Sequence, residues 1–251
     1  MIQAELIADT QWNGKRISTF RLTYPLFIHA QVLRHRAFSS SVSSARAIQP
    51  EKYRRLVEDN PVFPLQFGGG KKGMVAGPPV DYGAAAMVWA TALDRSLDAH
   101  KVMAAMGVHQ EVTNRLLAPF AHVVHLVTAT EWDNWYDLRL ADDAQPEVQE
   151  LARQMQELHK QTPVQDTAHR PFLTPEEFCL PEASYVSAAR CAQVSYLPET
   201  KKGWDESVVF AKKLARDKHW SPFEHVAISG YERICYRNFV GWKQIREAVG
   251  G

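Results

Sequence analysis

A basic, hydroxyl-rich stretch from Gln31 to Arg46 holds the side chains with the greatest chemical potential in this chain. It contains the triplet Arg34-His35-Arg36 and, after a run of serines, Ser44 and Arg46. Arginine offers a planar fork of donors that matches phosphate oxygens, and serine hydroxyls with backbone amides can complete a cradle for an oxyanion. The stretch therefore predicts a site for a small phosphorylated ligand. The alternative is a solvated, serine-rich loop after a helix.

The spacing of Arg34-His35-Arg36, Ser44 and Arg46 resembles the signature of the flavin-dependent thymidylate synthases. Three further segments are similar to parts of that family. They are Phe20–Gln31, similar to the strand and helix that lead into the signature; Gly107–Pro119, similar to a helix that ends in Arg-x-x-Leu-Pro; and Leu138–Ala152, similar to the last long helix, which carries a substrate-binding arginine.

A fourth match stands in an unexpected place. The segment His219-Trp-Ser-Pro-Phe-Glu-His225, with Ala188-Ala189-Arg190 before it, resembles segments that precede the signature in the family, but it lies near the C-terminus. The resemblance implies a circularly permuted member, and domains tolerate permutation when their termini lie close and exposed. It implies an α/β (α+β) fold with a central, mostly antiparallel sheet and long helices. The core would span residues 1–160, a linker 161–184, and the permuted segment 185–251.

The reaction that the resemblance implies is methylation of C5 of the uracil in dUMP. The carbon would come from methylenetetrahydrofolate and the hydride from reduced FAD, with NADPH as a further co-substrate. No cysteine lies near a matching motif, which agrees with a mechanism in which no enzyme thiol adds to the base. An arginine beside the pyrimidine carbonyls would stabilise negative charge on the ring. The resemblance also implies a homotetramer with shared active sites.

Individual roles follow from the resemblance, position by position. The catalytic role falls on Arg139, with Ser44 as a second catalytic candidate. Nucleotide binding is implied for Gln31, Arg34, Ser44, Arg46, Arg115 and Arg139, and flavin binding for Arg34, His35, Arg36, Asn134 and His225. Purely structural roles remain open: Arg115 could pair with Glu111, Arg139 could pair with Asp142 or Asp143, and His225 could be a buried histidine with satisfied partners.

The chain departs from the family pattern where substrate and flavin would meet. Ser41-Val42 stands where Asn-Glu is usual, Ala47 replaces a tyrosine, Thr128-Ala-Thr130 replaces a flavin-binding Asn-x-Arg pair, and Asp143 replaces a histidine. Two other functions therefore remain open. One is hydroxymethylation, or another C5 modification of a different pyrimidine nucleotide, as would suit a phage that modifies its DNA bases. The other is a non-catalytic relative that binds flavin or nucleotide.

Composition narrows the classes of partner. The chain has 251 residues, 45% of them hydrophobic and 23% charged, which is ordinary for a soluble globular protein. A net charge of +1 weighs against nucleic acid as a partner, including binding by an arginine-rich C-terminal helix. Three cysteines without a Cys-x-x-Cys pair favour a reducing compartment, and no signal peptide or membrane span is evident, so we expect a cytoplasmic protein. A metal site at His122, His125 and Glu131 lacks the usual His-Glu-x-x-His pattern, so we expect no metal.

Sequence patterns also predict the elements that position these residues. Alternation across Asn13-Gly14 predicts a hairpin over residues 1–24, and Pro25 begins a helix to about Arg36 on which Gln31 and Arg34 share a face. A long loop is expected over 47–82, with a short helix near Tyr53 and a glycine run that does not match a phosphate-binding loop. Further helices are expected at 83–118, over most of 122–160 with a break at Pro146, at 205–217, and at 236–248.

Overall fold

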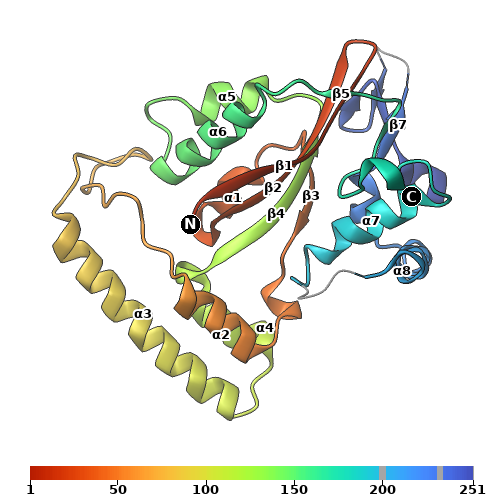
Figure 1. Ribbon diagram of the computed structural model, residues 1–251. Coiled ribbons are helices and arrows are strands. Elements are labelled where there is room, and N and C mark those ends of the chain that lie inside the picture. Colours follow the sequence, from red (N-terminus) through yellow and green to blue (C-terminus); the bar gives the residue numbers. More distant parts are fainter. Residues whose placement is uncertain (198–201, 231–233, 251) are drawn as a thin grey trace.

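The centre of the protein is a mixed five-stranded β-sheet, seen in the computed structural model of the chain (Figure 1). The structure describes residues 1–197, 202–230 and 234–250. The strand order is β3-β4-β2-β1-β5, and every neighbouring pair is antiparallel except β1 with β5. The strands are β1 (Gln3–Trp12), β2 (Lys15–Pro25), β3 (Ser39–Val42), β4 (His122–Ala129) and β5 (Val164–Gln165). The expected α/β class with a mostly antiparallel sheet is thus confirmed.

The hairpin predicted for the N-terminal residues is present as β1 and β2. Its turn residues, Asn13 and Gly14, have φ angles of 46° and 74°. A two-residue turn with positive φ at both positions matches the right-handed twist of its strands, and Asn-Gly adopts it at low cost. The hairpin strands make up the middle of the sheet, because β2 also pairs with β4 from Ser18 to Pro25.

Helices lie on both sides of this sheet. Figure 1 shows α5 and α6 on one side, α7 and α8 on the other, and the long α3 along an edge of the molecule. The α-helices are α1 (His29–Val32), α2 (Pro50–Asp59), α3 (Tyr82–Ala105), α4 (Gln110–Thr113), α5 (Asp133–Arg139), α6 (Pro146–Leu158), α7 (Ala183–Gln193) and α8 (Trp204–Arg216). The 3-10 helices are η1 (Leu26–Ile28), η2 (Ala45–Ala47), η3 (Asn114–Phe120), η4 (Pro175–Glu177), η5 (Ser221–Glu224) and η6 (Ile245–Val249).

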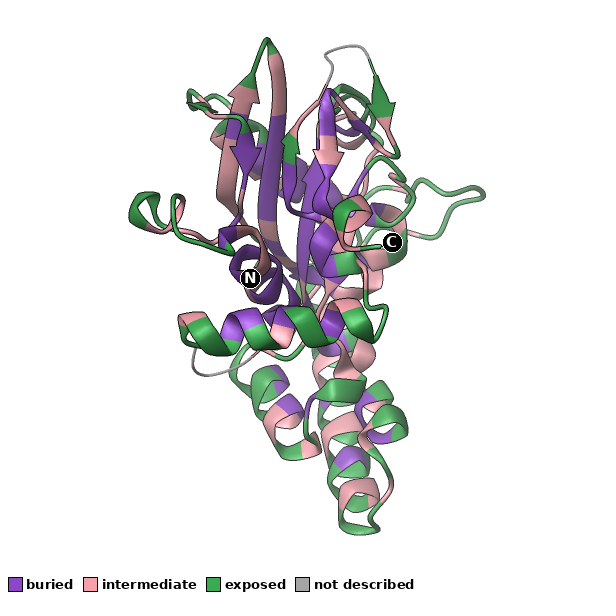
Figure 2. Cartoon of the chain, turned by 90° about the vertical axis from the view of Figure 1, so that its right-hand side faces the viewer, coloured by how far each residue is buried: buried purple, intermediate pink, exposed green. Residues whose placement is uncertain are grey.

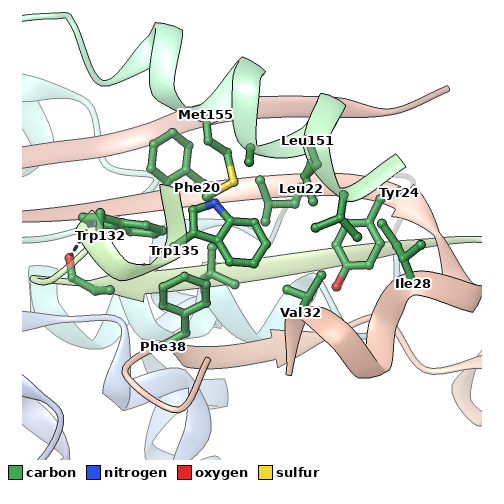
Figure 3. Close-up of a cluster of buried hydrophobic side chains, with 14 of the residues drawn as sticks. Phe20, Leu22, Tyr24, Ile28, Val32, Phe38, Trp132, Trp135, Leu151 and Met155 are labelled. Carbon is green, nitrogen blue, oxygen red and sulfur yellow. Dashed lines mark hydrogen bonds between the residues drawn. The ribbon is translucent and has the colours of Figure 1, made fainter. Parts of the chain in front are cut away.

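The two faces of the sheet bury different clusters. On the α5–α6 side, alternate residues of β2 pack with aromatic and aliphatic side chains from both helices, as Figure 3 shows for Phe20, Leu22, Trp135, Leu151 and Met155. On the other side, Leu126 of β4 contacts Cys191 and Val194 at the end of α7. Strands β2 and β4 are accordingly buried over most of their length (Figure 2). This packing fixes α1 and α5, which carry Gln31, Asn134 and Arg139 of the predicted site.

The first part of the expected helical region 122–160 is a strand, so that prediction is wrong for His122–Ala129. The stretch contains four β-branched residues (Val123, Val124, Val127 and Thr128), and β-branched side chains fit a pleated surface better than a helix. The rest of the region is helical as expected, and α6 begins afresh at Pro146, where the fixed φ of proline suits the first turn.

The expected helix over 236–248 is also wrong. This segment forms β8 (Cys235–Tyr236), β9 (Phe239–Val240) and β10 (Trp242–Gln244) before η6. Arg237 and Gly241 have φ angles of 59° and 76°, which a right-handed helix does not allow. Strand β10 instead pairs with β7 (Ala227–Ser229), and β7 pairs with β6 (Ala168–His169). The helix proposed for DNA binding is therefore absent.

Two other helices end earlier than expected. The helix expected over 83–118 ends at Ala105, because Gly107 at φ 76° turns the chain and Val108 N–H donates to Met103 O (3.1 Å), as in a Schellman motif. The helix after Pro25 reaches only Val32, with turns continuing through the Arg34 triplet. The short helix near Tyr53 and the helix at 205–217 are confirmed as α2 and α8.

Residues 161–184 were expected to be a linker, and they contribute β5, β6 and η4 to the packed structure. His169 in β6 is fully buried. The circular permutation and the domain boundaries at residues 160 and 184 stay predictions. Among the described residues, no helix has the length and apolar character needed to cross a membrane.

Candidate active site

The predicted catalytic arginine lies against the Arg34-His35-Arg36 turn. Arg139, the last residue of α5, donates from Nε to His35 Nε2 (3.0 Å) and from Nη2 to the carbonyl oxygen of Gln31 (3.2 Å). Its guanidinium carbon lies 5.9 Å from the ring centroid of Trp135, one turn earlier on the same helix. Because Trp135 is buried in the core, α5 holds Arg139 in a fixed position over α1.

His35 is held as a neutral imidazole. Its ring stacks on Phe38 at 5.7 Å and meets Trp135 edge-on at 4.7 Å. Burial and then the positive charge of Arg139 lower the pKa of His35 to about 4. Because Nε2 accepts a hydrogen bond from Arg139, the ring proton of the neutral form must be on Nδ1. No partner occupies Nδ1 within the described part of the chain, so this N–H can donate to a ligand.

Arginines around His35 lack the partners that other arginines in the protein have. Arg16, Arg54 and Arg190 each pair with a carboxylate at the surface or in the core. In the described ranges no carboxylate pairs with Arg34, Arg36 or Arg139. Burial and the nearby charge of Arg34 both lower the pKa of Arg139. Three guanidinium groups without a counter-ion would gain free energy from an anion, which is the electrostatic signature expected of a phosphate-binding site.

The remaining nucleotide-binding candidates form a second group around Glu111. Arg46 Nη1 lies 3.8 Å from the Glu111 carboxylate, and Arg115 Nε donates to the Glu111 carbonyl oxygen (2.9 Å). The proposed pairing of Arg115 with Glu111 is thus made to the backbone, and the carboxylate faces Arg46. Ser44 precedes η2, and its N–H donates to Ser195 O (3.1 Å), so its hydroxyl rather than its amide is available for a ligand.

Strand β3 separates the two groups. The Arg34 triplet precedes Ser39 at one end of β3, and Ser44 and Arg46 follow Val42 at the other. Figure 1 shows β3 running from the region of α1 towards η2 and α4. Within the described ranges, no hydrogen bond or ion pair joins Arg139, His35 or Arg34 to Ser44, Arg46 or Arg115. The sequence-predicted residues are therefore brought together in two halves and not as one pocket.

His225 is buried in a hydrogen-bonded network. Its Nδ1 lies 2.8 Å from Thr128 Oγ1 and its Nε2 lies 2.9 Å from Ser41 Oγ, and its side chain has no exposed surface. The network continues through Thr19 and His169 to Thr10, with steps of 2.7 to 2.8 Å. His225 is thus a buried histidine with both ring nitrogens bonded, as the structural alternative expected. A contact between His225 and a flavin stays a prediction.

The departures from the family pattern are built into the fold. Thr128 is fully buried in the same network, and Thr130 Oγ1 accepts from Val240 N–H (3.0 Å) in the C-terminal segment. Val42 packs against the apolar cluster, beside His125 on β4. Asn134, in contrast, is exposed on α5. The exposed flavin candidates are thus Arg34, Arg36 and Asn134, a donor set that suits the phosphates and polar edges of a dinucleotide.

Two residues that position predicted site residues were not identified from the sequence. Asn114 is fully buried and donates from Nδ2 to Ala45 O (2.8 Å) and Ile48 O (2.9 Å), which fixes the segment that carries Arg46. Gln145 accepts from Gln31 Nε2 (2.5 Å), which orients a predicted nucleotide-binding side chain. Asn114 directly precedes Arg115 and Gln145 follows Arg139 by six residues, but neither contact could be read from sequence spacing.

The residues considered for a metal do not converge. On β4, His122 Nε2 lies 2.6 Å from the N-terminal nitrogen of Met1, whereas His125 Nδ1 lies 2.7 Å from the Tyr24 hydroxyl. Residues three apart on a strand point to opposite faces. In the part of the chain that the structure describes, no group of three or more ligating side chains is placed to hold a metal ion.

Comparison with protein families shows which family the chain belongs to. Residues 17–164 match the family described as thymidylate synthase complementing protein. Because the match covers more than half of the chain, the protein belongs to this family, that of the flavin-dependent thymidylate synthases, and is an enzyme of the methylase type. The matched region includes both halves of the candidate site and none of the segment 185–251.

Solved structures similar to this one include a UMP/dUMP methylase, PolB, from Streptomyces cacaoi bound with 5-Br UMP. The similarity has a TM-score of 0.50 and 16% identity, and it covers 63% of this chain and 88% of that chain. The same enzyme bound with 5-Br dUMP matches with a TM-score of 0.43 and 20% identity over 57% and 65% of the two chains. The first similarity shows a shared fold. No curated protein sequence matched.

Proposed function

We propose that this protein transfers a one-carbon unit to C5 of a pyrimidine nucleotide of the UMP/dUMP type, in a flavin-dependent methylation like that from dUMP to dTMP. The observation that carries the proposal is the set of three guanidinium groups, Arg34, Arg36 and Arg139, which have no carboxylate partner among the described residues and lie around a neutral His35. Family membership and the ligand in the name of the similar methylase support the choice of nucleotide.

Each side chain has a role that its contacts allow. Arg139 would stabilise negative charge that develops on the pyrimidine ring, because its orientation is already fixed by His35 and Trp135. His35 Nδ1–H would donate to an oxygen of the ligand. Gln31 would hold the nucleotide beside Arg139, and Ser44, Arg46 and Arg115 would bind the 5′-phosphate. Glu111 contacts both arginines, Arg46 through its carboxylate and Arg115 through its carbonyl oxygen.

The residues present fit a flavin at its charged end. Arg34 and Arg36 are exposed and without carboxylate partners in the described ranges, so they could hold the phosphates of FAD, with Asn134 as a further donor. Bound FAD would supply the hydride, while methylenetetrahydrofolate would supply the carbon and NADPH the reducing equivalents. We propose no flavin contact for Thr128 or Thr130, because both hydroxyls are already bonded within the chain.

The separation of the two arginine groups supports a shared site. A nucleotide that meets Arg139 with its base and Arg46 with its phosphate would have to be bound by two copies of the chain. We therefore propose a homotetramer in which one subunit supplies the Arg139 half and another supplies the Arg46 half.

The test measures how the protein binds and converts dUMP, UMP and dCMP in the presence of FAD, methylenetetrahydrofolate and NADPH. We expect a nucleotide-dependent change in flavin absorbance and release of tritium from [5-³H]dUMP or [5-³H]UMP. In Arg139→Gln, kcat/KM should fall about 10²–10³-fold, the loss typical of removing one preorganised charge-stabilising donor. Arg153→Gln, which removes an exposed arginine paired with Glu150, is the matched control. Equal turnover in both variants, or no nucleotide binding by the wild type, would contradict the proposal.

A further inference from the structure

The C-terminal segment contacts the arginine turn, which is formed by residues 34–36. Asn238 donates from Nδ2 to the carbonyl oxygen of Ala37 (2.9 Å), the residue directly after this turn. No backbone N–H among the described residues donates to Ala37 O. The two residues are 201 positions apart in sequence, and Asn238 lies outside the region that matches the family. The arginine turn is therefore held at its C-terminal end by a side chain from a distant part of the chain.

The orientation of the Asn238 side chain is fixed by its other contacts. Gln244 donates from Nε2 to Asn238 Oδ1 (2.7 Å), and Asn238 Nδ2 uses its second N–H to donate to Ser39 Oγ (3.1 Å). If the amide of Asn238 were turned over, its oxygen would face the carbonyl oxygen of Ala37, and two acceptors form no hydrogen bond. Only one orientation therefore satisfies the amide, and it directs a donor at Ala37.

Asn238, Gln244 and Ser39 form a closed cluster at the start of β3. Gln244 Nε2 donates to Ser39 Oγ (3.1 Å) as well as to Asn238. Gln244 is 1% exposed and Ser39 is 2% exposed, whereas Asn238 is half-buried. Hydrogen bonds in such a shielded place are stronger than in water, and the members of a network support one another. The cluster thus joins β10, the β8–β9 turn and β3 at the end of the arginine turn.

The hairpin that carries Asn238 has its own anchors in the protein. Asn238 lies in the turn between β8 and β9. The next residue, Phe239, is fully buried, and Val240 N–H donates to Thr130 Oγ1 (3.0 Å) just after β4. The apolar cluster around Phe239 also contains Ile17, Ala227 and Trp242. Because these anchors do not involve the arginine turn, Asn238 provides a fixed point to which the turn is attached.

The arginine turn has only short-range hydrogen bonds of its own. Arg36 N–H donates to Arg34 O (3.1 Å), and Phe38 N–H donates to His35 O (3.1 Å). Fixing the Ala37 carbonyl restricts the backbone dihedral angles on both sides of it, including those next to Arg36. A backbone that is already ordered loses less conformational entropy when it binds a ligand, so the restriction favours binding.

We propose that Asn238 is a positioning residue for the anion site of the arginine turn. It holds the turn in the conformation in which Arg34 and Arg36 bind the diphosphate of a dinucleotide, and it acts through Ala37 and not by contact with the ligand. The C-terminal hairpin is thereby part of the binding machinery. The identity of the dinucleotide as FAD rests on the proposed function.

The first measurement is amide hydrogen exchange, resolved by NMR, in the full chain and in Asn238→Ala and Asn238→Asp. Both variants lose the donor to Ala37 O, and the aspartate keeps the size of the side chain and the acceptor for Gln244. We expect exchange at Arg36 and Phe38 to be about threefold to tenfold faster in both, the effect of one lost hydrogen bond. Lys243→Gln, on β10 with its ammonium paired with Glu247 (3.4 Å), is the matched control.

The second measurement is the dissociation constant for FAD, from quenching of flavin fluorescence, and for ADP, which has the diphosphate without the flavin ring. Both constants should rise about threefold to tenfold in the two Asn238 variants and stay unchanged in Lys243→Gln. Exchange in residues 43–48, which carry Ser44 and Arg46, should not change. A purely structural role of Asn238 would not produce this restriction to one half of the site.

Unchanged exchange at residues 34–38 in both Asn238 variants would overturn the inference. So would an acceleration of the same size in residues 43–48, because Asn238 would then stabilise the fold in general, and so would unchanged affinity for both ligands. If Asn238→Ala does not fold, Asn238→Asp decides the outcome. A wild type that binds ADP but not FAD would contradict the proposed function and leave the ADP affinities of the variants to decide the inference. A wild type that binds neither would overturn both.

Discussion

At the scale of single residues, the contact between Arg139 and His35 shows how a fold prepares a charged site before any ligand is present. The imidazole accepts from the guanidinium (3.0 Å), so each group fixes the state of the other. Burial, and in addition the repulsion between a cationic histidine and the cationic arginine, lower the pKa of His35 and keep its imidazole neutral. The positive charge is thus concentrated on the arginines, where an anionic nucleotide can use it.

We expect Arg139→Gln to raise the pKa of His35 from about 4 towards, but not to, its ordinary value. Burial, the larger cause of the lowered pKa, remains in the variant, whereas the repulsion from Arg139 is removed. A pH titration of the imidazole signals by NMR measures the shift. Arg153→Gln should leave the His35 titration unchanged. If the His35 pKa were the same in Arg139→Gln as in the wild type, the proposed coupling of these two groups would be wrong.

At the scale of elements, buried histidines attach the C-terminal segments to the sheet. His169 of β6 bonds Thr10 and Thr19 on β1 and β2, and His225 after η5 bonds Ser41 and Thr128 on β3 and β4. Four strands are joined through side chains to elements more than ninety residues away in sequence. These bonds hold β3 in place between the two arginine groups, so the network supports the geometry of the site from behind.

We expect His225→Ala to lower the free energy of unfolding by about 2–4 kcal/mol, because it leaves the buried Ser41 hydroxyl without its partner, removes one of the two partners of the Thr128 hydroxyl and creates a cavity. Urea denaturation measures the loss. His219→Ala, in the same segment but exposed, should change stability by less than about 0.5 kcal/mol. Equal effects of the two substitutions would show that the network contributes little to the attachment of this segment.

The same network predicts sensitivity to acid. Burial lowers the pKa of His169 and of His225 to about 3. In the unfolded chain both would titrate near pH 6.5, so between about pH 6.5 and pH 3 the unfolded state binds more protons than the folded state. We therefore expect stability to fall as the pH is lowered through this window, and to fall less steeply in His225→Ala. Urea midpoints measured from pH 7.5 to pH 4 would contradict this if their slope were the same in both proteins.

How far the sequence predicts the elements depends on whether their signals are local. Asn13-Gly14 and Pro146 act within a few residues, and the hairpin and the start of α6 were predicted correctly. Strand β10 is three residues long and exists because Trp242–Gln244 pairs with Ala227–Ser229, which no local pattern reveals. The site follows the same rule. The Arg34 triplet was identified from its spacing, whereas its contact with Arg139 spans more than a hundred residues of sequence and needed the fold.

At the scale of the whole molecule, α3 presents a surface that one chain leaves uncovered. Only Leu93 and His100 of its 24 residues are buried, while Met87, Val88 and Val102 are 60–71% exposed. Exposed apolar residues that recur along one long helix are typical of a contact between protein chains. Together with the division of the arginines into two groups, this surface supports the proposal that the active enzyme is an assembly.

A shared site makes a specific prediction for mixtures of inactive variants. Arg139→Gln and Arg46→Gln should each lack most activity as pure proteins, because every site in either assembly has one defective half. If one subunit supplies the Arg139 half and another the Arg46 half, co-expression of the two variants should restore part of the activity, because some sites then combine two intact halves. Light scattering should show an assembly larger than one chain.

Co-expression of Arg139→Gln with Arg34→Gln is the matched control, since both defects lie in the same half and should not complement. Absence of recovery in the first pair, with both variants folded and assembled, would mean that each chain builds its own site, and the two arginine groups would then need a conformational change to meet.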